Sequence, residues 1–502
     1  MTKYVIGLDN GGTSSKAAVF DLHGKEIATA SRSTKMITPQ SGYTERDMEE
    51  LWIANCECIK EATEKAGIAP SEVIGLAVCG HGKGLYPWGK DNKPAYNGII
   101  STDNRAWEYA KKWTENGIKD KLHDRLCQEF MACQQVCLLA WMKDHHRDVY
   151  DNIQYVFSVK DYIRFRLTGE AYCEVTDISG SGLMNIRDIR FDKDILEELG
   201  IGEVYDKLPE IKYSYEHCGA ITEESSALTG LPVGTPVAGG MFDIDACAVA
   251  MDITSPEQLI TIAGTWSINE YISKEPVMDG TIAMNSRYAI PGYYLIEESS
   301  ATSSGNLEWY ITNCLKTEDI PENENKYDYI NRLVSEVKPE ECDVYFLPFL
   351  YGSNAHALAK ASFVGLTTYH SAAHMLRAIY EGVVYSAKTH IDKLLLSREE
   401  PKAIRMAGGP VKSKVWVQMF ADVLGYPIEV VDANELGALG CGMAASVAAG
   451  IYKDYKEAAK EMVHISGTVY PDMDKHEIYL KKYQKYRAVS AALDTVWDQF
   501  EV

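Results

Sequence analysis

The sequence predicts an α/β protein of two domains, and three observations carry that prediction. Strand-like and helical patterns alternate along the 502 residues. The length suits about two to four domains at roughly 100 to 200 residues each. Two stretches, starting near Tyr4 and Gln258, share the order of an apolar run, a turn of small residues and a second strand-like run. A break in the apolar periodicity near residues 250–256 then divides the chain into domains over 1–250 and 251–502.

The first half is expected to open with a β-meander. Residues 4–8 are an apolar, β-rich run, and Asn10-Gly11-Gly12 supplies turn chemistry before a second strand over 16–20 and a third over 26–30. Periodicity then predicts, in chain order, a helix over 48–66, a buried strand over 73–79 and a helix over 136–145. This alternation indicates α/β architecture.

The second half begins like the first, with an apolar run over 258–262, the turn Ala263-Gly264-Thr265 and a strand-like run over 266–272. These residues leave open whether one structural unit was duplicated or a common hairpin pattern recurs by chance. The later elements are a long helix that begins after an N-cap at Ser371, a strand over 403–407, a helix over 416–424, an Ala/Gly-rich segment over 435–450 and a charged helical stretch over 452–502.

The acidic composition limits the partners that the protein can have. Lys+Arg 50 against Asp+Glu 72 gives a formal net charge of −22, so the field of the protein repels nucleic-acid backbones and anionic membranes. The 12 cysteines form no CxxC pair, which argues against zinc knuckles. The first residues form no long apolar run, and no stretch of about 18 apolar residues follows. We therefore expect a cytoplasmic protein that binds neither nucleic acid nor membranes.

One chemical motif spans residues 7–16, Gly-Leu-Asp-Asn-Gly-Gly-Thr-Ser-Ser-Lys. Asp9 at a strand end would anchor the waters of a Mg²⁺ ion, the glycine turn would expose backbone amides, and Lys16 would add positive charge. A Mg²⁺-bound polyphosphate needs these groups, although the GxxxxGK[ST] loop is absent. Taken alone, this motif is better interpreted as a hairpin turn rich in small residues.

A second motif, at residues 239–245, places an aspartate after a buried strand and two glycines. Such a carboxylate is placed to face a cleft and to take a proton from a substrate hydroxyl. The alternative is an aspartate that caps the following helix. The residues alone do not choose between Asp243 and Asp245. Two further turns of small residues lie at 263–265 and 407–410.

These four elements, in this order and spacing, resemble the FGGY family of carbohydrate kinases, which belongs to the actin-like ATPase-domain superfamily. The resemblance spans nearly the whole chain. It implies an α/β fold of two actin-like (ribonuclease H-like) domains with a nucleotide cleft between them. The first domain would bind the sugar, and the second, with a C-terminal helical cap, would bind the nucleotide. Further family-like stretches lie at residues 42–47, 160–169, 176–179 and 377–383.

The resemblance also implies a role for each motif residue in phosphoryl transfer from ATP, a reaction that depends on positioning and charge neutralisation. Asp243 would be the general base, and Asp9 would organise the Mg²⁺ shell. The nucleotide would contact Gly12, Thr13, Ser14, Lys16, Gly264, Thr265, Gly305, Gly408 and Gly409. The sugar would contact His81, Lys83, Asp103 and Asp243. For the first three of these, an ordinary packing or solvated side chain is the alternative.

Within the family, the sequence is most similar to the bacterial L-xylulose kinases, through residues 79–85, 101–106, 302–309 and 346–354. D-xylulose kinases typically carry Gln-Met-His-Gly where this chain has His81-Gly82-Lys83-Gly84, and L-xylulose kinases tend to carry glutamine at the position of His81. We therefore predict that ATP and Mg²⁺ serve to phosphorylate a hydroxyl of L-xylulose. The alternatives are 3-keto-L-gulonate, D-xylulose, L-ribulose, erythritol or glycerol as the substrate, and a non-catalytic actin-fold sensor. A homodimer is left open.

Overall fold

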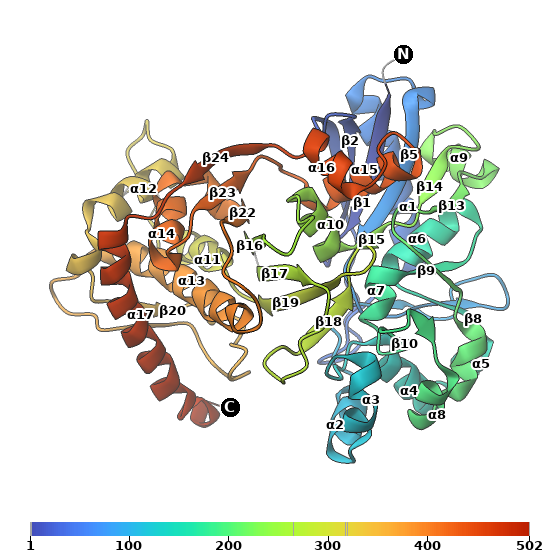
Figure 1. Cartoon of the computed structure of the whole chain (residues 1–502), viewed down its shortest axis with the longest axis horizontal. Helices are drawn as coiled ribbons and strands as arrows, with labels where there is room; N and C mark the ends of the chain where they lie inside the picture. Colours follow the sequence, from blue (N-terminus) through green and yellow to red (C-terminus); the bar gives the residue numbers. More distant parts are fainter. Residues whose placement is uncertain (1–2, 265, 317, 319, 501–502) are drawn as a thin grey trace. The chain divides into compact units, whose positions relative to one another are not determined.

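The computed structural model describes residues 3–264, 266–316, 318 and 320–500. They form two compact units, each built from several stretches of the chain. Unit 1 combines residues 1–254, 272–296 and 435–463, and unit 2 combines residues 255–271, 297–434 and 464–502. Sheets that mix parallel and antiparallel strands are flanked by helices (Figure 1), so the predicted α/β class is confirmed.

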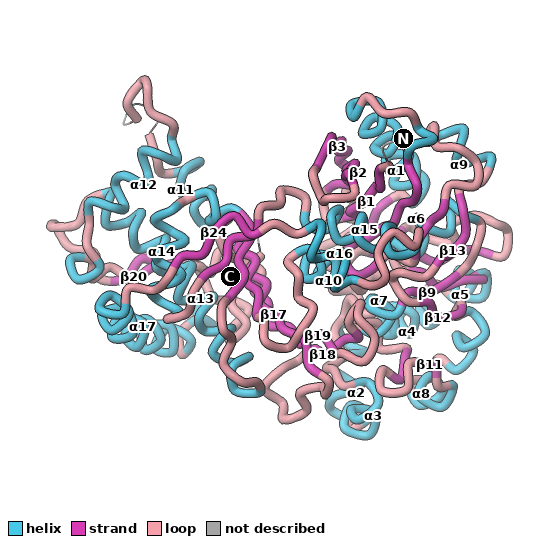
Figure 2. Tube along the Cα trace, turned by 45° about the horizontal axis from the view of Figure 1, so that its top comes forward, coloured by secondary structure: helices cyan, strands magenta, loops and turns pink. Residues whose placement is uncertain are grey.

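Unit 1 is built on a seven-stranded sheet of order β13-β14-β5-β1-β2-β3, with β15 paired to β5. The first three strands in sequence are the predicted meander, and they lie side by side in Figure 2. The strands are β1 (Tyr4–Asn10), β2 (Ser14–Asp21), β3 (Glu26–Ser33), β5 (Val73–Gly80), β13 (His217–Ala220), β14 (Pro236–Ala238) and β15 (Met241–Phe242). Short two-stranded pairs join β4 (Glu45–Arg46) to β7 (Gly98–Ile99), β6 (Tyr86–Gly89) to β8 (Ile153–Phe157), β9 (Tyr172–Glu174) to β12 (Glu210–Lys212) and β10 (Met184–Asn185) to β11 (Arg190–Phe191).

The helices of unit 1 begin and end at residues whose chemistry explains the boundaries. In α1 (Met48–Ala66), the Asp47 side chain accepts the Glu50 amide at the N-terminus, and Gly67 adopts the left-handed conformation at the C-terminus. The other helices are α2 (Trp107–Glu115), α3 (Ile118–Leu126), α4 (Gln135–His145), α5 (Arg147–Asn152), α6 (Val159–Thr168), α7 (Val175–Ser179), α8 (Lys193–Glu198), α9 (Glu223–Thr229), α10 (Asp243–Ala250), α15 (Leu436–Ala448) and α16 (Tyr455–Met462).

The two faces of β1 contact different helices because successive side chains of a strand point to opposite faces. Ile6 and Leu8 belong to the apolar core that α1 helps to form. Gly7 faces α15, and a Cβ atom at Gly7 would collide with the backbone of Ala438. The absence of a side chain at Gly7 therefore lets α15 lie directly on the sheet, as Figure 1 shows.

Unit 2 holds most of the second seven-stranded sheet, whose order is β18-β19-β17-β16-β22-β23-β24. The strands are β16 (Leu259–Ala263), β17 (Ser267–Ser273), β18 (Met284–Arg287), β19 (Tyr294–Ser300), β22 (Ile404–Gly408), β23 (Ile428–Val431) and β24 (Ile465–Val469). A short hairpin joins β20 (Tyr345–Leu347) to β21 (Ser362–Val364). The helices are α11 (Gly305–Asn313), α12 (Lys326–Glu336), α13 (Ala372–Leu394), α14 (Lys414–Leu424) and α17 (Met473–Asp494).

Most predicted elements are present, and one segment differs. Ser371 is the N-cap of α13, as predicted. The stretch after residue 452 was expected to be helical, but β24 interrupts it between α16 and α17. This strand is missed because it is short, polar and largely exposed, and its apolar alternation is too weak to distinguish it from a loop.

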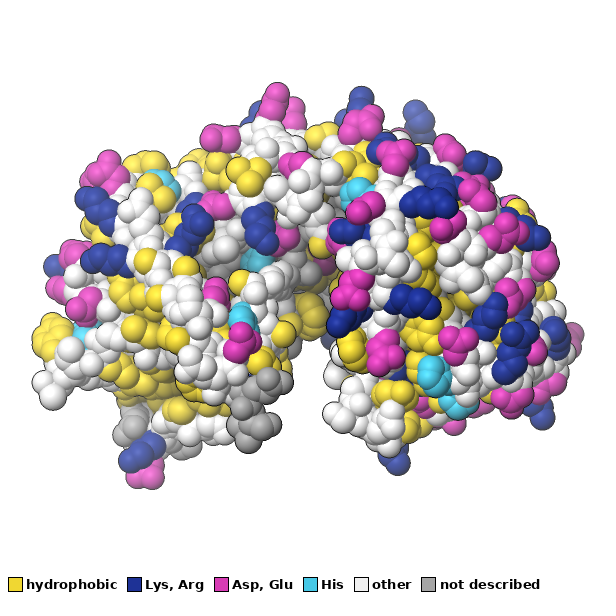
Figure 3. All heavy atoms as spheres, turned by 90° about the horizontal axis from the view of Figure 1, so that it is seen from below, with side chains coloured by type: hydrophobic (Ala, Val, Ile, Leu, Met, Phe, Trp, Pro, Cys, Tyr) yellow, Lys and Arg dark blue, Asp and Glu magenta, His cyan; other side chains and the backbone are white. Residues whose placement is uncertain are grey.

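The surface of the described chain matches its acidic, globular composition. Acidic and basic side chains are interspersed on the face that Figure 3 shows. Among the described helices, none combines the length and the apolar character needed to cross a bilayer.

Candidate active site

Three parallel strands of unit 1 end at the same edge of the sheet. β1 and β15 both pair with β5 in parallel, and the register aligns Asp9 and Met241 with Cys79. Phe242 is aligned with Gly80, so the next residues, Asp243 and His81, leave the sheet together. Ligands of open α/β sheets bind at this carboxyl edge. The strand register therefore places the predicted base beside the predicted sugar loop.

The two candidate acids both affect the pKa of the Cys79 thiol at the end of β5. Burial and a hydrogen bond with Cys441 raise the pKa of this thiol, and the nearby carboxylates of Asp9 and Asp243 raise it further. Both acids therefore lie within electrostatic reach of the end of β5. Asp243 is half-buried and is the first residue of α10. Asp245, which the sequence could not distinguish from Asp243, is fully buried and accepts the backbone amide of Ala289.

Asp9 lies near the end of β1, just before the turn to β2, and faces α15. A Cβ atom at Gly437 would lie 2.8 Å from its Oδ2 atom, so the glycine leaves room for the carboxylate. Burial raises the pKa of Asp9, and the charge of Lys16 partly opposes that shift. Within the described chain, the buried Oδ1 atom of Asp9 has no hydrogen-bond partner. This oxygen can therefore accept a water or a metal ion.

The turn between β1 and β2 is held from one side by an arginine. Arg46 donates a 3.2 Å hydrogen bond to the carbonyl oxygen of Gly11 and another to that of Gly12. Gly12 and Thr13 are exposed, and Ser14 is half-buried. Because Arg46 engages the carbonyls, the amides of this exposed turn are available for an anion.

Lys16, predicted to bind phosphate, already has an acidic partner. Its Nζ atom lies 3.0 Å from Oε2 of Glu435, the residue just before α15. The Lys16 side chain remains 38% exposed. The pair joins the β1–β2 hairpin to the start of α15, and a phosphate would have to compete with Glu435 for this ammonium group.

The predicted sugar loop follows β5. His81 is buried, its Nε2 atom lies 2.9 Å from the Tyr86 hydroxyl, and burial lowers the pKa of the imidazole to about 4. His81 is therefore neutral at physiological pH. Lys83 is half-buried and has a left-handed φ of 63°. A bulky residue in this conformation is uncommon and costs free energy.

Phe242 joins the sugar loop to the candidate base. Its ring fills the space beside Gly82, where a Cβ atom would collide with it. The Lys83 ammonium lies 5.7 Å from the ring centroid, within the range of a cation–π contact. The residue directly before Asp243 thus supports the loop that carries Lys83.

Asp103, the third predicted sugar ligand, is buried in an ion pair. Its two oxygens accept hydrogen bonds from Arg105 at 2.9 and 2.8 Å, and Oδ2 also accepts the Thr44 amide at 2.7 Å. A sugar hydroxyl that contacts Asp103 would share this carboxylate with Arg105.

Four of the predicted nucleotide glycines come together within unit 2. Gly408 pairs with Ala263 across β16 and β22, and its φ of 102° requires glycine. Ser304, directly before Gly305 and α11, donates its hydroxyl to the Gly264 carbonyl oxygen at 2.7 Å. A Cβ atom at Gly409 would lie 3.5 Å from the Ser304 hydroxyl oxygen. The predicted phosphate binder Thr265 lies outside the described residues.

A cavity of about 260 Å³ opens beside these glycines. The rings of Tyr380 and Trp416 stack at its wall with centroids 3.9 Å apart. This volume lies near the lower end of the roughly 300–1,000 Å³ typical of small-molecule pockets and suits a planar base. The lining residues are Ser304, Leu307, Glu308, Tyr327, Asn331, Tyr380, Gly409, Lys412, Ser413 and Trp416.

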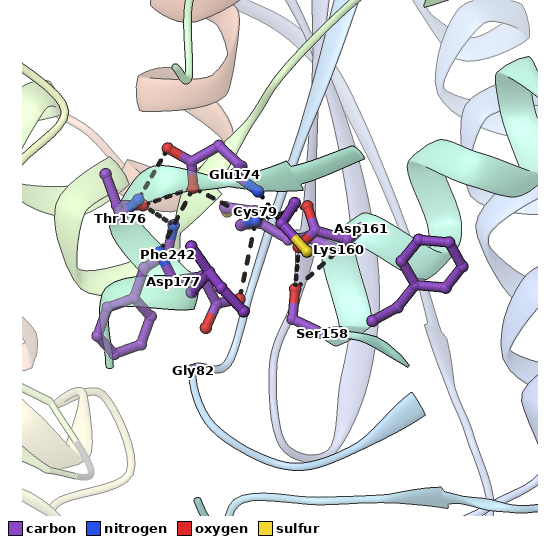
Figure 4. Close-up of polar contacts among 12 residues, drawn as sticks. Cys79, Gly82, Ser158, Lys160, Asp161, Glu174, Thr176, Asp177 and Phe242 are labelled. Carbon is purple, nitrogen blue, oxygen red and sulfur yellow. Dashed lines mark hydrogen bonds and ion pairs between the residues drawn. The ribbon is translucent and has the colours of Figure 1, made fainter. Parts of the chain in front are cut away.

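A buried charged cluster lies where the start of α6, the end of β9 and α7 meet (Figure 4). Lys160 lies 2.8 Å from Asp161, 3.3 Å from Glu174 and 3.8 Å from Asp177. Burial opposes the charge of Lys160, but these acids raise its pKa above the ordinary value. Burial raises the pKa of Asp177 to about 7. The sequence analysis included Lys160, Asp161 and Asp177 only in family-like stretches, did not single out Glu174, and gave no reason to connect these residues with Asp243.

Comparison with known proteins identifies the class of enzyme. The model of the N-terminal domain of the FGGY family of carbohydrate kinases matches residues 4–250, and that of the C-terminal domain matches residues 259–449. The chain belongs to the FGGY family of carbohydrate kinases. It is therefore a sugar phosphotransferase that uses ATP.

Particular relatives match along nearly their full length. The L-xylulose/3-keto-L-gulonate kinase of Escherichia coli K12 is 38% identical over 98% of both chains. A protein of Pasteurella multocida named a probable L-xylulose kinase is 35% identical over 98% of this chain and 99% of its own. The ligand-bound xylulose kinase of Lactobacillus acidophilus superposes with a TM-score of 0.89 at 24% identity, covering 99% of this chain and 100% of its own. This last likeness supports the two-domain fold.

Proposed function

We propose that the enzyme transfers the γ-phosphoryl group of ATP to a hydroxyl of L-xylulose. The observation that carries the proposal is the parallel register of β5 and β15, which sets Asp243 beside the loop of His81 and Lys83. Two relatives whose names include L-xylulose kinase, at 38% and 35% identity, support this sugar.

Asp243 acts as the general base. Its carboxylate takes the proton from the acceptor hydroxyl, the hydroxyl oxygen forms a bond to the γ-phosphorus, and the bond from the γ-phosphorus to the bridging oxygen breaks to release ADP. The exposed amides of the Gly12–Thr13 turn and the hydroxyl of Ser14 bind the phosphates. Unit 1 thus supplies both the proton acceptor and an anion site.

Mg²⁺ is the divalent ion that we assign to the ATP. The buried Oδ1 atom of Asp9 has no hydrogen-bond partner in the described chain. A carboxylate oxygen is the kind of hard group that Mg²⁺ and its bound waters interact with. Among the described residues, no three His, Cys, Asp or Glu side chains form a metal-binding group. We therefore propose that Asp9 accepts hydrogen bonds from the waters of a Mg²⁺ ion bound to the ATP phosphates. The bound ion would neutralise charge on the transferring phosphates.

The cavity beside Tyr380 and Trp416 binds the adenine base. Changing Gly409 to Val should place two methyl groups in this cavity without backbone strain, since Gly409 has no positive φ and its Cβ position is free of close contacts. We expect the KM for ATP to rise by at least about 10-fold, a loss of roughly 1.4 kcal/mol in binding, and the KM for the sugar to change little. Steady-state kinetics with each substrate varied in turn measures both constants.

Gly467→Val is the matched control, because Gly467 lies in the exposed strand β24 of the same unit and a Cβ there meets nothing within 4 Å. It should leave both KM values unchanged. Equal KM values for ATP in Gly409→Val and the unmodified enzyme would remove this cavity from the nucleotide site.

Lys83 is assigned to sugar binding. Its ammonium group offers three donors to a carbonyl or hydroxyl oxygen of the sugar. Methionine is a close substitute because it is also long and unbranched, so the change does not add β-branching at this left-handed position. Lys83→Met should raise the KM for the preferred sugar by about 10-fold while the KM for ATP hardly changes, as the loss of a ground-state contact requires. The control Lys25→Met removes an exposed lysine from the β2–β3 turn. Equal sugar KM values in the two variants would contradict the assignment.

The second candidate substrate is 3-keto-L-gulonate, and one observation favours it. The Lys83 ammonium projects over the Phe242 ring, where it could pair with the carboxylate that this sugar carries and L-xylulose lacks. A panel of ketoses and polyols, compared by kcat/KM, decides between them. The highest value for D-xylulose or glycerol would overturn both substrate proposals and leave the family intact.

A further inference from the structure

The buried charged cluster of unit 1 consists of Lys160, Asp161, Arg164, Glu174 and Asp177, none more than 2% exposed. Burying ionised groups is costly unless each is paired. Lys160 meets this requirement through three acids, and Arg164 lies 2.8 Å from Asp161. The cluster therefore fixes the ends of α6, β9 and α7 relative to one another.

Glu174 connects the charged cluster to Thr176 through two hydrogen bonds. As the N-cap of α7, Glu174 accepts the Thr176 amide at 3.1 Å through Oε1 and the Thr176 hydroxyl at 2.7 Å through Oε2. Both donors of Thr176 are thus committed to one carboxylate. The lone pairs of the Thr176 hydroxyl remain for an incoming donor.

That donor is the backbone amide of Phe242, whose nitrogen lies 2.8 Å from the Thr176 Oγ1 atom. Figure 4 shows the chain of contacts from Lys160 through Glu174 and Thr176 to Phe242. Phe242 is the N-cap of α10, makes no side-chain cap itself, and directly precedes Asp243. Its ring also supports Gly82 and Lys83. A shift of Phe242 would therefore move the base and the sugar loop together.

We propose that Thr176 is a positioning residue for phosphoryl transfer, which holds the Phe242 backbone so that Asp243 meets the acceptor hydroxyl. The proposal rests on the assignment of Asp243 as the base. Thr176 is fully buried, so its proposed role is exerted through Phe242 and not by contact with a substrate. It acts through a hydrogen bond whose far end is anchored by the charge of Lys160 and Glu174.

The test compares Thr176→Val with Thr176→Ser. Valine keeps the shape of threonine and removes the acceptor for Phe242, so we expect kcat to fall by about 10- to 100-fold, the order of loss that a small misplacement causes. The KM values for ATP and sugar should change by less than about 3-fold, because the groups that bind substrates remain. Serine keeps the hydroxyl and should restore most of kcat. A general loss of structure would lower the melting temperature and alter both KM values as well.

Thr229→Val is the matched control, since Thr229 is a buried threonine of α9 whose hydroxyl also donates one hydrogen bond and accepts one from a backbone amide. It donates to the Ser225 carbonyl oxygen and accepts the Leu231 amide. This variant should leave kcat unchanged. A kcat for Thr176→Val equal to that of the unmodified enzyme would overturn the proposal, as would a serine variant no better than the valine variant. If Thr176→Val does not fold, Thr176→Ala removes the same acceptor for the Phe242 amide, and a kcat equal to that of the unmodified enzyme there would also overturn the proposal.

The variant Asp243→Asn separates this proposal from the one on which it rests. An inactive Asp243→Asn enzyme with a fully active Thr176→Val enzyme refutes the positioning role alone. An active Asp243→Asn enzyme refutes the base, and with it the reason for positioning Asp243.

Discussion

Replacing Asp243 with Asn is expected to lower kcat by about 10²- to 10⁴-fold, the usual contribution of a general base. Asparagine keeps the size and the hydrogen-bonding shape of the side chain but cannot accept the hydroxyl proton. ATP binding should be retained, because the cavity assigned to adenine is formed by other residues, including Tyr380, Gly409 and Trp416. Initial rates at saturating sugar and ATP, with nucleotide binding measured by calorimetry, check both parts of the prediction.

Asp245→Asn is the control for this experiment. Asp245 is buried two residues further along α10 and accepts the Ala289 amide, a bond that asparagine can also accept. Its kcat should stay within about 3-fold of the unmodified value, as expected of a residue outside the chemistry. Near-normal turnover in Asp243→Asn would rule out Asp243 as the base.

The second large effect is expected at Asp9. Asp9→Asn should lower the apparent affinity for Mg²⁺, and with it the rate at limiting Mg²⁺, by about 10- to 100-fold, as loss of a partner of the metal's ligands typically does. The fold should be retained, because asparagine fits the space beside Gly437 that the carboxylate occupies. A Mg²⁺ titration of the initial rate at fixed ATP measures the shift.

Asp21→Asn provides the comparison, because Asp21 ends the neighbouring strand β2 and its Oδ1 atom accepts two backbone amides of an exposed turn. This variant should titrate with Mg²⁺ like the unmodified enzyme. If Asp9→Asn also gives an unchanged Mg²⁺ dependence, Asp9 does not organise the metal.

Local chemistry explains why most of the fold could be predicted from the sequence. The helix boundaries at Asp47 and Ser371 follow from capping, which depends on neighbouring residues only. The composition of the two units could not be predicted in the same way. Residues 435–463 belong to unit 1, and the close approach of α15 to Gly7 that brings them there is a contact between distant parts of the chain.

In the candidate site too, some features could be predicted from the sequence and others could not. The positions of Asp9 and Asp243 at the carboxyl ends of strands could be predicted, because acids at strand ends gather at one edge of a parallel sheet. The choice of Asp243 over Asp245 came only from the family resemblance, and the roles of both acids stay predictions. The engagement of Lys16 by Glu435 and of Asp103 by Arg105 could not be predicted, since a sequence does not show which partner a charge meets. Thr176 had no chemical character that marked it, and the positioning role proposed for it depends on the 2.8 Å hydrogen bond from the Phe242 amide.

Under the proposed assignment of Lys83 to sugar binding, the left-handed backbone at position 83 limits how the substrate preference of this enzyme can be engineered. Glycine, asparagine and aspartate adopt such a φ most readily, whereas valine, isoleucine and threonine are strongly disfavoured there. A library at this position therefore samples a narrower range of side chains than the full set of amino acids. The substitutions Lys83→Asn and Lys83→Asp would release backbone strain while exchanging a cation for an amide or an anion. Selections for activity on new sugars should therefore recover glycine or side chains with a hydrogen-bond acceptor, such as asparagine and aspartate, at position 83. Branched apolar residues should appear there only when neighbouring residues change with them.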